Sequence, residues 1–256
     1  SSVRPRLAWS GVADTGVGLY WYRVEISSRS DFAVMDKVET TASTTYSPSA
    51  DLSEGTYNWR VRAVDRLFLE SSGTDTGNFT VDITIPGDVA LSYPLDNVDT
   101  GNLHPVFSWA AAADTGSGVD YYRVEISTYI GFDTLSFSGT TAVSPLTYAD
   151  TITENTYYWR VRTYDRATNE RTGGTTRLFR VDITVPAYVD ITAPADGSET
   201  MTGMPVFAWA ASADTGSGVK WYRVELSTSG SFSYMNYTET TAATTYQPAG
   251  ALDDNT

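Results

Sequence analysis

The chain has 256 residues, no cysteine, one histidine and a formal net charge of −14. The missing thiols exclude disulfides and thiolate metal sites, and the single imidazole excludes a multi-histidine zinc site. The acidic balance argues against nucleic acid and anionic membrane surfaces as partners. No apolar run reaches the ~18 residues of a membrane span, so no direct membrane insertion is predicted.

The sequence repeats with a period of 100 residues. Residues 105–129 and 205–229 are identical at 19 of 25 positions, with no insertion or deletion. A strict period of this size indicates an array of similar modules rather than one large core. We therefore predict three modules, at residues 1–84, 85–184 and 185–256. They are called the first, second and third repeats.

The second repeat is predicted to be complete, because it holds seven short segments rich in β-branched and aromatic residues. In chain order they are 89–93, 105–111, 119–127, 132–138, 143–148, 156–165 and 178–184. No segment shows a helical period, so the predicted fold class is all-β. The first repeat is expected to lack its first strand and the third its last two. We therefore expect the chain to be part of a longer array, with strands supplied by a neighbouring molecule as the alternative.

Alternation predicts the faces of the strands. Tyr122, Val124 and Ile126 should face the core, and so should alternate residues from Tyr157 to Val161. Glu125 falls on the opposite face, where it can meet arginines of the 156–165 strand. We predict surface ion pairs there, worth ~0–1 kcal/mol each.

Three segments together resemble a fibronectin type III module. They are Pro-Val-Phe-Ser-Trp (105–109), Tyr-Tyr-Arg-Val-Glu-Ile-Ser (121–127) and Tyr-Tyr-Trp-Arg-Val-Arg-Thr-Tyr-Asp (157–165). Trp109 is similar to the second-strand tryptophan of that family, and Tyr157 to its tyrosine-corner residue. The segments 180–186 and 165–169 resemble linker and loop motifs of bacterial Ig-like surface repeats. This resemblance implies tandem antiparallel β-sandwiches and is weakly specific for function.

Ala-Asp-Thr-Gly occurs once per repeat, which places its Asp-Thr-Gly tripeptide at Asp14, Asp114 and Asp214. The tripeptide is similar to the aspartic protease signature, but a dyad needs two copies face to face and a linear array separates them. We predict instead a turn in which the aspartate bonds its own backbone and the glycine supplies a positive φ. We also leave open that this turn ligates a cation.

The resemblance also implies a cation site between modules. It places the loops of Asp114 and Asp165 at the end that faces the preceding module, so that both approach Asp82 of the linker. Asp214 should approach Asp182 in the same way. Clustered carboxylates are the ligands that calcium prefers. Calcium is therefore the one cofactor expected; the rival interpretation is that the linker aspartates only end strands and that Asp165 pairs with an arginine.

Other candidates have plainer interpretations. Trp21, Tyr121 and Trp221 recur on the outer face of the third strand; they either cover their neighbours or stack on glycan. Asn78 and Asn236 lie in N-glycosylation sequons. His104 is predicted to be an ordinary loop residue.

The function expected from the sequence is that of a non-enzymatic extracellular structural protein at the cell surface. It would be a stalk, an adhesin shaft, or a filament or sheath subunit whose partners are copies of itself or other surface components. The alternative is a set of glycan-binding accessory modules of a secreted polysaccharide-active enzyme.

Overall fold

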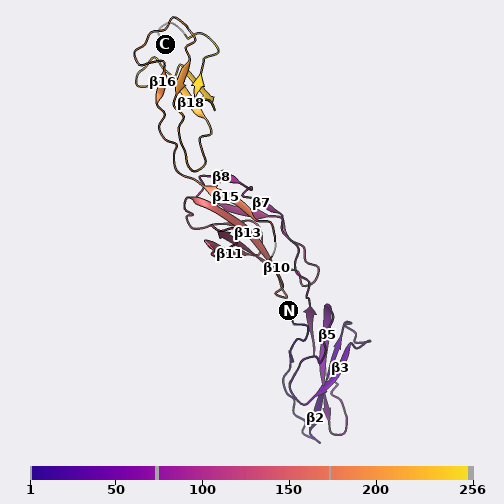
Figure 1. The fold of residues 1–256 in the computed structure, drawn as a ribbon. Helices are drawn as coiled ribbons and strands as arrows, with labels where there is room; N and C mark the ends of the chain where they lie inside the picture. Colours follow the sequence, from indigo (N-terminus) through magenta and orange to yellow (C-terminus); the bar gives the residue numbers. More distant parts are fainter. Residues whose placement is uncertain (1, 73–74, 173, 253–256) are drawn as a thin grey trace. The chain divides into compact units, whose positions relative to one another are not determined.

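A computed structural model describes residues 2–72, 75–172 and 174–252 (Figure 1). All regular elements among these residues are β-strands, joined by turns and loops. None of the described residues forms a helix long and apolar enough to cross a membrane. The chain is all-β, as predicted.

The chain divides into two compact units. One comprises residues 1–96, 105–149 and 158–177, and the other comprises 97–104, 150–157 and 178–256. The boundary passes through the second repeat, so the division into three modules stays a prediction. The first linker, residues 82–86, lies in the first unit, and the second linker, residues 182–186, lies in the second unit.

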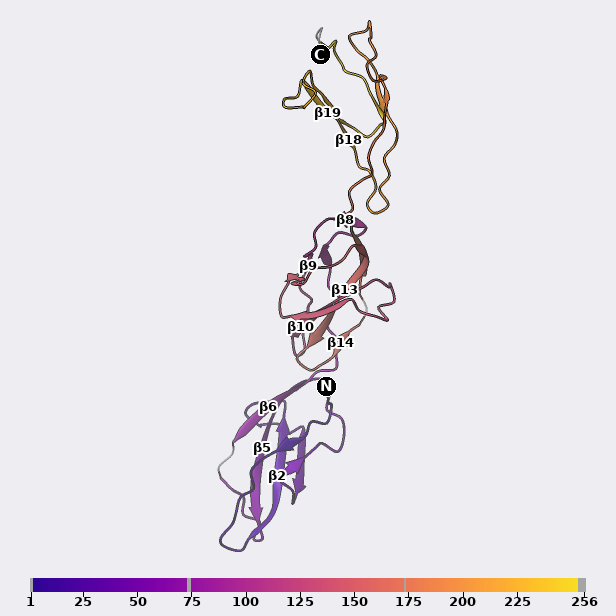
Figure 2. The same cartoon turned by 90° about the vertical axis from the view of Figure 1, so that its left-hand side faces the viewer.

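The first repeat has a four-stranded sheet of order β3-β2-β5-β6 and a separate pair, β1-β4. Figure 2 labels β2, β5 and β6 of the larger sheet. All pairings are antiparallel. The strands are β1 (Leu7–Ala8), β2 (Leu19–Ser27), β3 (Lys37–Thr41), β4 (Thr45–Tyr46), β5 (Gly55–Asp65) and β6 (Thr76–Val81).

The second repeat has one sheet of order β11-β10-β13-β15-β8, to which β14 adds beside β13, and a second sheet of order β12-β9-β7. The pairing of β15 with β8 is parallel. The strands are β7 (Leu91–Tyr93), β8 (Val98–Thr100), β9 (Val106–Trp109), β10 (Val119–Ser127), β11 (Phe137–Thr141), β12 (Leu146–Thr147), β13 (Asn155–Asp165), β14 (Glu170–Arg171) and β15 (Arg177–Val181).

The third repeat has two small sheets, β16-β17-β20 and β18-β19. Its strands are β16 (Ile191–Ala193), β17 (Phe207–Trp209), β18 (Tyr222–Leu226), β19 (Tyr237–Thr241) and β20 (Thr245–Tyr246). Among residues 185–252, no strand follows β20 to pair with the second edge of β18 as β13 pairs with β10.

The core faces follow the alternation of the sequence. Tyr122, Val124 and Ile126 of β10 are buried, and so are Tyr157, Trp159 and Val161 of β13. Trp109 packs edge-on against Tyr122, with ring centroids 5.4 Å apart. The hydroxyl of Tyr157 donates to the carbonyl of Thr153 at 3.0 Å, which is the bond expected of a tyrosine corner.

The predicted surface position of Glu125 is wrong. Its side chain accepts from Arg160 at 2.7 Å and from Arg162 at 2.9 Å, and the residue is only 3% exposed. The Arg160 guanidinium also lies 4.0 Å from the centre of the Phe132 ring. The arginine stems cover the carboxylate, so a position on the solvent side of the strand is nevertheless buried.

The strand predicted at 132–138 is also wrong. Phe132 has a φ of 58°, and its N–H donates to the Tyr129 carbonyl at 3.0 Å. This turn inserts the ring beneath Arg160, and strand β11 begins only at Phe137. Two short strands, β8 and β14, were not predicted, because three and two residues are too few to show a period.

Candidate functional site

Each linker aspartate enters a loop of the following repeat. Asp82 follows β6 and is fully buried at 0% exposure. One of its carboxylate oxygens, Oδ2, accepts from the Ser117 N–H at 2.6 Å, and Oδ1 accepts from the Thr84 N–H at 3.0 Å. The linker is therefore held by a residue 35 positions further along the chain.

The receiving loop is the Asp-Thr-Gly turn. Asp114 Oδ1 accepts from the amides of Gly116 at 3.1 Å and Gly118 at 2.7 Å, so the aspartate does bond its own loop. The positive φ lies at Gly118 (82°), and not at Gly116 as predicted. Gly116 serves close approach instead, because a Cβ there would lie within 3.0 Å of the Asp82 carboxylate.

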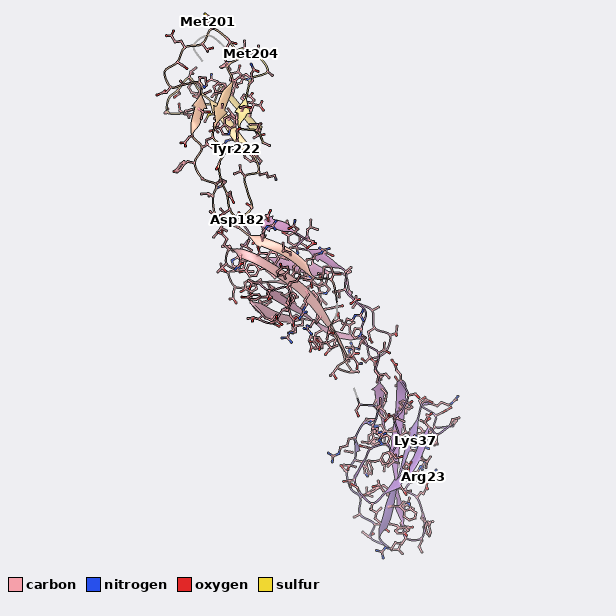
Figure 3. The ribbon with its side chains drawn as sticks, viewed as in Figure 1. Arg23, Lys37, Asp182, Met201, Met204 and Tyr222 are labelled. Carbon is pink, nitrogen blue, oxygen red and sulfur yellow. The ribbon has the colours of Figure 1, made fainter. Side chains whose placement is uncertain are left out.

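The second linker makes the same contacts. Asp182 accepts from the Ser217 N–H through Oδ2 and from the Thr184 N–H at 3.0 Å through Oδ1. Figure 3 marks Asp182 in the extended segment that follows β15. A Cβ on Gly216 would lie within 3.0 Å of this carboxylate. We call the glycine and the next residue, 116–117 or 216–217, the linker socket.

Further contacts fix the linker after its aspartate. Thr84 Oγ1 donates to Glu54 at 2.7 Å, and Thr184 Oγ1 donates to Glu154 at 2.9 Å. Three residues beyond each threonine, an amide donates to a loop carbonyl of the next repeat. These bonds join Gly87 to Ala113 and Ala187 to Ala213, both at 2.9 Å.

Asn169 adds a clamp at the first linker. Its Nδ2 donates to the carbonyls of Asp82 at 2.9 Å and Thr84 at 3.2 Å, and to Asp165 Oδ2 at 2.8 Å. Sequence analysis did not assign this role. The available signal was the exchange of Asn169 for Leu69 in the otherwise similar loop of the first repeat.

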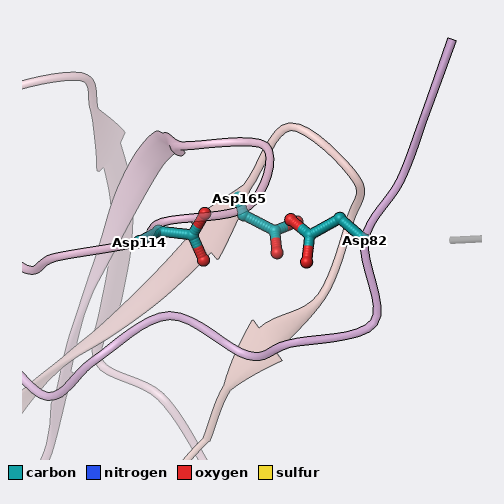
Figure 4. Close-up of side chains that lie close together, drawn as sticks. All are labelled: Asp82, Asp114 and Asp165. Atoms are coloured by element: carbon teal, nitrogen blue, oxygen red, sulfur yellow. The ribbon is translucent and has the colours of Figure 1, made fainter. Parts of the chain in front are cut away.

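The carboxylates of Asp82, Asp114 and Asp165 lie together (Figure 4). One oxygen from each lies within 4.8 Å of the other two. Asp165 is 1% exposed, and its described partner is Asn169 rather than an arginine. Asp114 Oδ2 is buried and accepts no hydrogen bond from the described residues. The cluster thus offers hard oxygen ligands, one of them without a donor.

Electrostatics keep the linker carboxylates ionised. Burial acts to raise the pKa of Asp82, but hydrogen bonds from Ser117 and Thr84 outweigh it and lower the pKa below its ordinary 3.8. Hydrogen bonds from Ser217 are the main reason why the pKa of Asp182 is also lowered. The carboxylates of Asp82 and Asp182 are therefore negatively charged at neutral pH. Asp214 bonds the amides of Gly216 and Gly218 in its own loop.

The three candidate aromatics differ in their surroundings. Trp21 contacts Tyr20 and Phe68, with ring centroids 3.9 and 5.6 Å away. Tyr121 stacks on Tyr164 at 4.6 Å with an interplanar angle of 11°. Trp221 is exposed.

The remaining candidates lie outside the linker sites. Asn78 is exposed on β6, and Asn236 is exposed just before β19, where it accepts from the Thr228 N–H at 2.9 Å. Their glycosylation stays a prediction. His104 is an exposed loop residue whose Nδ1 lies 3.0 Å from the Asp150 carbonyl.

No family model matches the chain, and no curated protein matches it. The solved structures similar to it include fibronectin(III)-like modules of Clostridium thermocellum CbhA, with 13% identity, 66% of this chain and 80% of that chain covered, and a TM-score of 0.40. They also include chicken CNTN1 FN1–FN3 domains, with 11% identity, 94% and 82% covered, and a TM-score of 0.29.

The repeats have a fold similar to that of fibronectin type III modules. The antiparallel sheets, the core tryptophan of β9 and the tyrosine-corner bond agree with the resemblance that the sequence indicated. At these identities and TM-scores the comparisons carry no conclusion about function, so the role of this chain is argued from its linkers.

Proposed function

We propose that the chain is a non-enzymatic extracellular structural array, such as a stalk, an adhesin shaft or a surface filament. One observation supports this proposal above the others: the same joint is built twice. Asp82 and Asp182 each enter a glycine socket of the following repeat and accept from its next amide. A joint copied with each repeat serves the spacing of modules, whereas a catalytic site needs to be made only once.

The proposed mechanism is mechanical. The linker is extended, and the proline that ends it (Pro86 or Pro186) limits φ. Its aspartate, threonine and following amide are each bonded within the joint. The Asp-Thr-Gly carboxylates hold their own loops, a role that requires no shared proton and no partner carboxylate from another copy.

The joint can be tested by spin-label distance measurements. Because the chain has no cysteine, Thr40→Cys and Thr140→Cys give two unique labels at exposed positions. We expect a narrow distance distribution that broadens with Gly116→Ala, since the added methyl group displaces the Asp82 carboxylate. The matched control is Gly16→Ala, where the nearest heavy atom is Asp14 Oδ1 at 3.3 Å. Equal widths for the two variants would contradict the proposed joint.

Calcium is the cofactor that we propose for the first joint. Asp114 Oδ2 accepts no hydrogen bond from the described residues, and Asp82 and Asp165 supply carboxylates beside it. A divalent cation would offset the mutual repulsion of the three charges and link the linker to both loops of the second repeat.

The same labels test the calcium proposal. Excess calcium is expected to narrow the distance distribution and raise the melting temperature relative to the chelated protein, because the cation binds only the closed joint. Asp165→Asn should remove both effects, and Asp65→Asn in the first repeat should remove neither. Identical distributions and melting curves with calcium and with chelator would leave the joint held by hydrogen bonds and proline alone.

Glycan binding is the second candidate function, and exposed aromatic rings favour it. Tyr20, Trp21 and Phe68 form a cluster whose ring centroids are 3.9 to 5.9 Å apart, and Tyr20 and Phe68 are exposed. If the chain is an accessory module, it should be retained by an insoluble polysaccharide such as cellulose. Trp21→Ala and Trp221→Ala should each weaken that retention more than Tyr121→Ala, whose ring is stacked on Tyr164. Retention that is absent, or equal in all variants, would oppose this function.

A further inference from the structure

In the second and third repeats, a first strand follows the linker and pairs with the next strand of the module. Leu91 lies opposite Trp109, and Ile191 lies opposite Trp209. The amide after each tryptophan, at Ala110 or Ala210, donates at 2.8 Å to the carbonyl of the residue just before this first strand. Linker and first strand therefore form one continuous docked segment.

The equivalent edge of the first repeat is open among the described residues. Strand β1 pairs with β4 on one side and with no described strand on the other. A cleft of about 1100 Å³ lies beside it. Its lining includes Trp9, Asp14, Tyr22, Trp59, Leu69 and Thr76. Trp9 is partly exposed there, whereas its equivalent Trp109 is buried.

Asp14 and Thr15 line this cleft, and the next two residues, 16–17, correspond to the linker sockets of the other repeats. Asp14 accepts from the amides of Gly16 and Gly18, both at 2.9 Å, and Gly18 has a φ of 89°. The Arg66 amide donates to the Gly18 carbonyl at 3.3 Å, as Arg166 does to Gly118 at 3.1 Å in the second repeat. Val17 takes the place of Ser117, whose amide binds the linker aspartate.

We propose that the cleft beside β1 binds an extended strand from another repeat of this kind. The aspartate of that strand enters the socket at Gly16 and accepts from the Val17 amide. Its backbone pairs with β1 and accepts from the Ser10 amide. An apolar residue fills the space next to Trp9, as Leu91 does next to Trp109. Main-chain bonds supply affinity, and the aspartate and the apolar residue supply register.

The walls of the cleft also select among strands. In the second repeat Arg171 pairs with Asp88, and Arg177 donates to the carbonyls of Ser92 and Pro94. The first repeat has Ser71 and Gly77 at the two arginine positions, and Glu70 and Asp75 line its cleft. An acidic residue at the position of Asp88 is therefore disfavoured. The segment 181–194, which has Tyr188 there, fits better than the segment 81–94.

The test uses the full chain and a synthetic peptide with the sequence of residues 181–194 and blocked ends. Hydrogen exchange is measured residue by residue as the peptide is added. We expect the Ser10 and Val17 amides to exchange about tenfold more slowly, because each gains a hydrogen bond. The peptide of residues 81–94 should require a higher concentration for the same protection.

Two changes check the socket. The peptide variant Asp182→Ala and the chain variant Gly16→Ala should each abolish protection at Val17, and both should weaken binding. Gly230→Ala, in open space in the third repeat, is the matched chain control and should bind as the parent does. Melting curves confirm that Gly16→Ala folds.

Two results would overturn the proposal. One is the absence of protection at Ser10 and Val17 at millimolar peptide. The other is binding that neither socket change weakens, which would show non-specific apolar association.

Discussion

Trp159→Ala is expected to destabilise the second repeat by about 3–5 kcal/mol, because it leaves a large cavity in a closed core. Trp159 is 0% exposed, and its ring centroid lies 5.1 Å from that of Phe107. A module has only ~5–15 kcal/mol of stability, so this loss takes a large part of it. Hydrogen exchange of the Val124 and Val161 amides in urea measures the change within this repeat alone.

Two controls separate cavity formation from general disturbance. Trp159→Phe removes an indole N–H that has no partner among the described residues and leaves a smaller cavity, so it should cost clearly less than alanine. Trp221→Ala removes a ring that is 51% exposed and should change stability by no more than about 0.5 kcal/mol. Equal losses for Trp159→Ala and Trp221→Ala would contradict the core that the structure describes.

Glu125→Ala is expected to cost about 3–5 kcal/mol, although a single carboxylate is removed. The carboxylate is the shared partner of Arg160 and Arg162, and Arg123 lies 3.5 Å away. Without it, partly buried guanidinium groups face one another unpaired. The urea dependence of hydrogen exchange at Val124 reports the loss.

The third repeat offers a matched control for this change. Glu225 follows the same Tyr-Arg-Val sequence as Glu125, but its side chain is 30% exposed and its ion pair among the described residues is with Arg223 at 2.8 Å. Glu225→Ala should therefore cost less than about 1 kcal/mol. Similar losses of stability at the two positions would show that the burial of Glu125 by the arginines of β13 does not add to its effect on stability.

The contrast between Val124 and Glu125 shows what the sequence could predict. Alternation placed Val124 in the core correctly, because side chains in a strand point to opposite faces with a period of two. The same rule placed Glu125 at the surface, and this was wrong. Alternation describes a strand alone, whereas the burial of Glu125 results from long arginine side chains on the neighbouring strand.

The sequence likewise predicted one part of the linker site and missed another. The sequence indicated that Asp82, Asp114 and Asp165 would approach one another, and the structure places them together. The roles of Asn169 and Glu54 were missed. Asn169 bonds a linker residue 87 positions earlier in the chain, and Glu54 meets a threonine 30 positions later. No local pattern encodes such a contact, and only the comparison of Asn169 with Leu69 pointed to it.

The identity of the two joints also bears on how such a chain can change in length. Excising residues 85–184 would join Asp82-Ile-Thr84 to Val185-Pro186, and Asp82 would then precede Gly216 and Ser217 at the spacing that Asp182 has now. Glu54 would still hold Thr84. Recombination between copies of the repeat can thus delete or duplicate whole modules while each joint keeps its linker aspartate, its glycine socket and its threonine–glutamate bond. The reach of the array can evolve in steps of one module, without a compensating substitution at the new boundary.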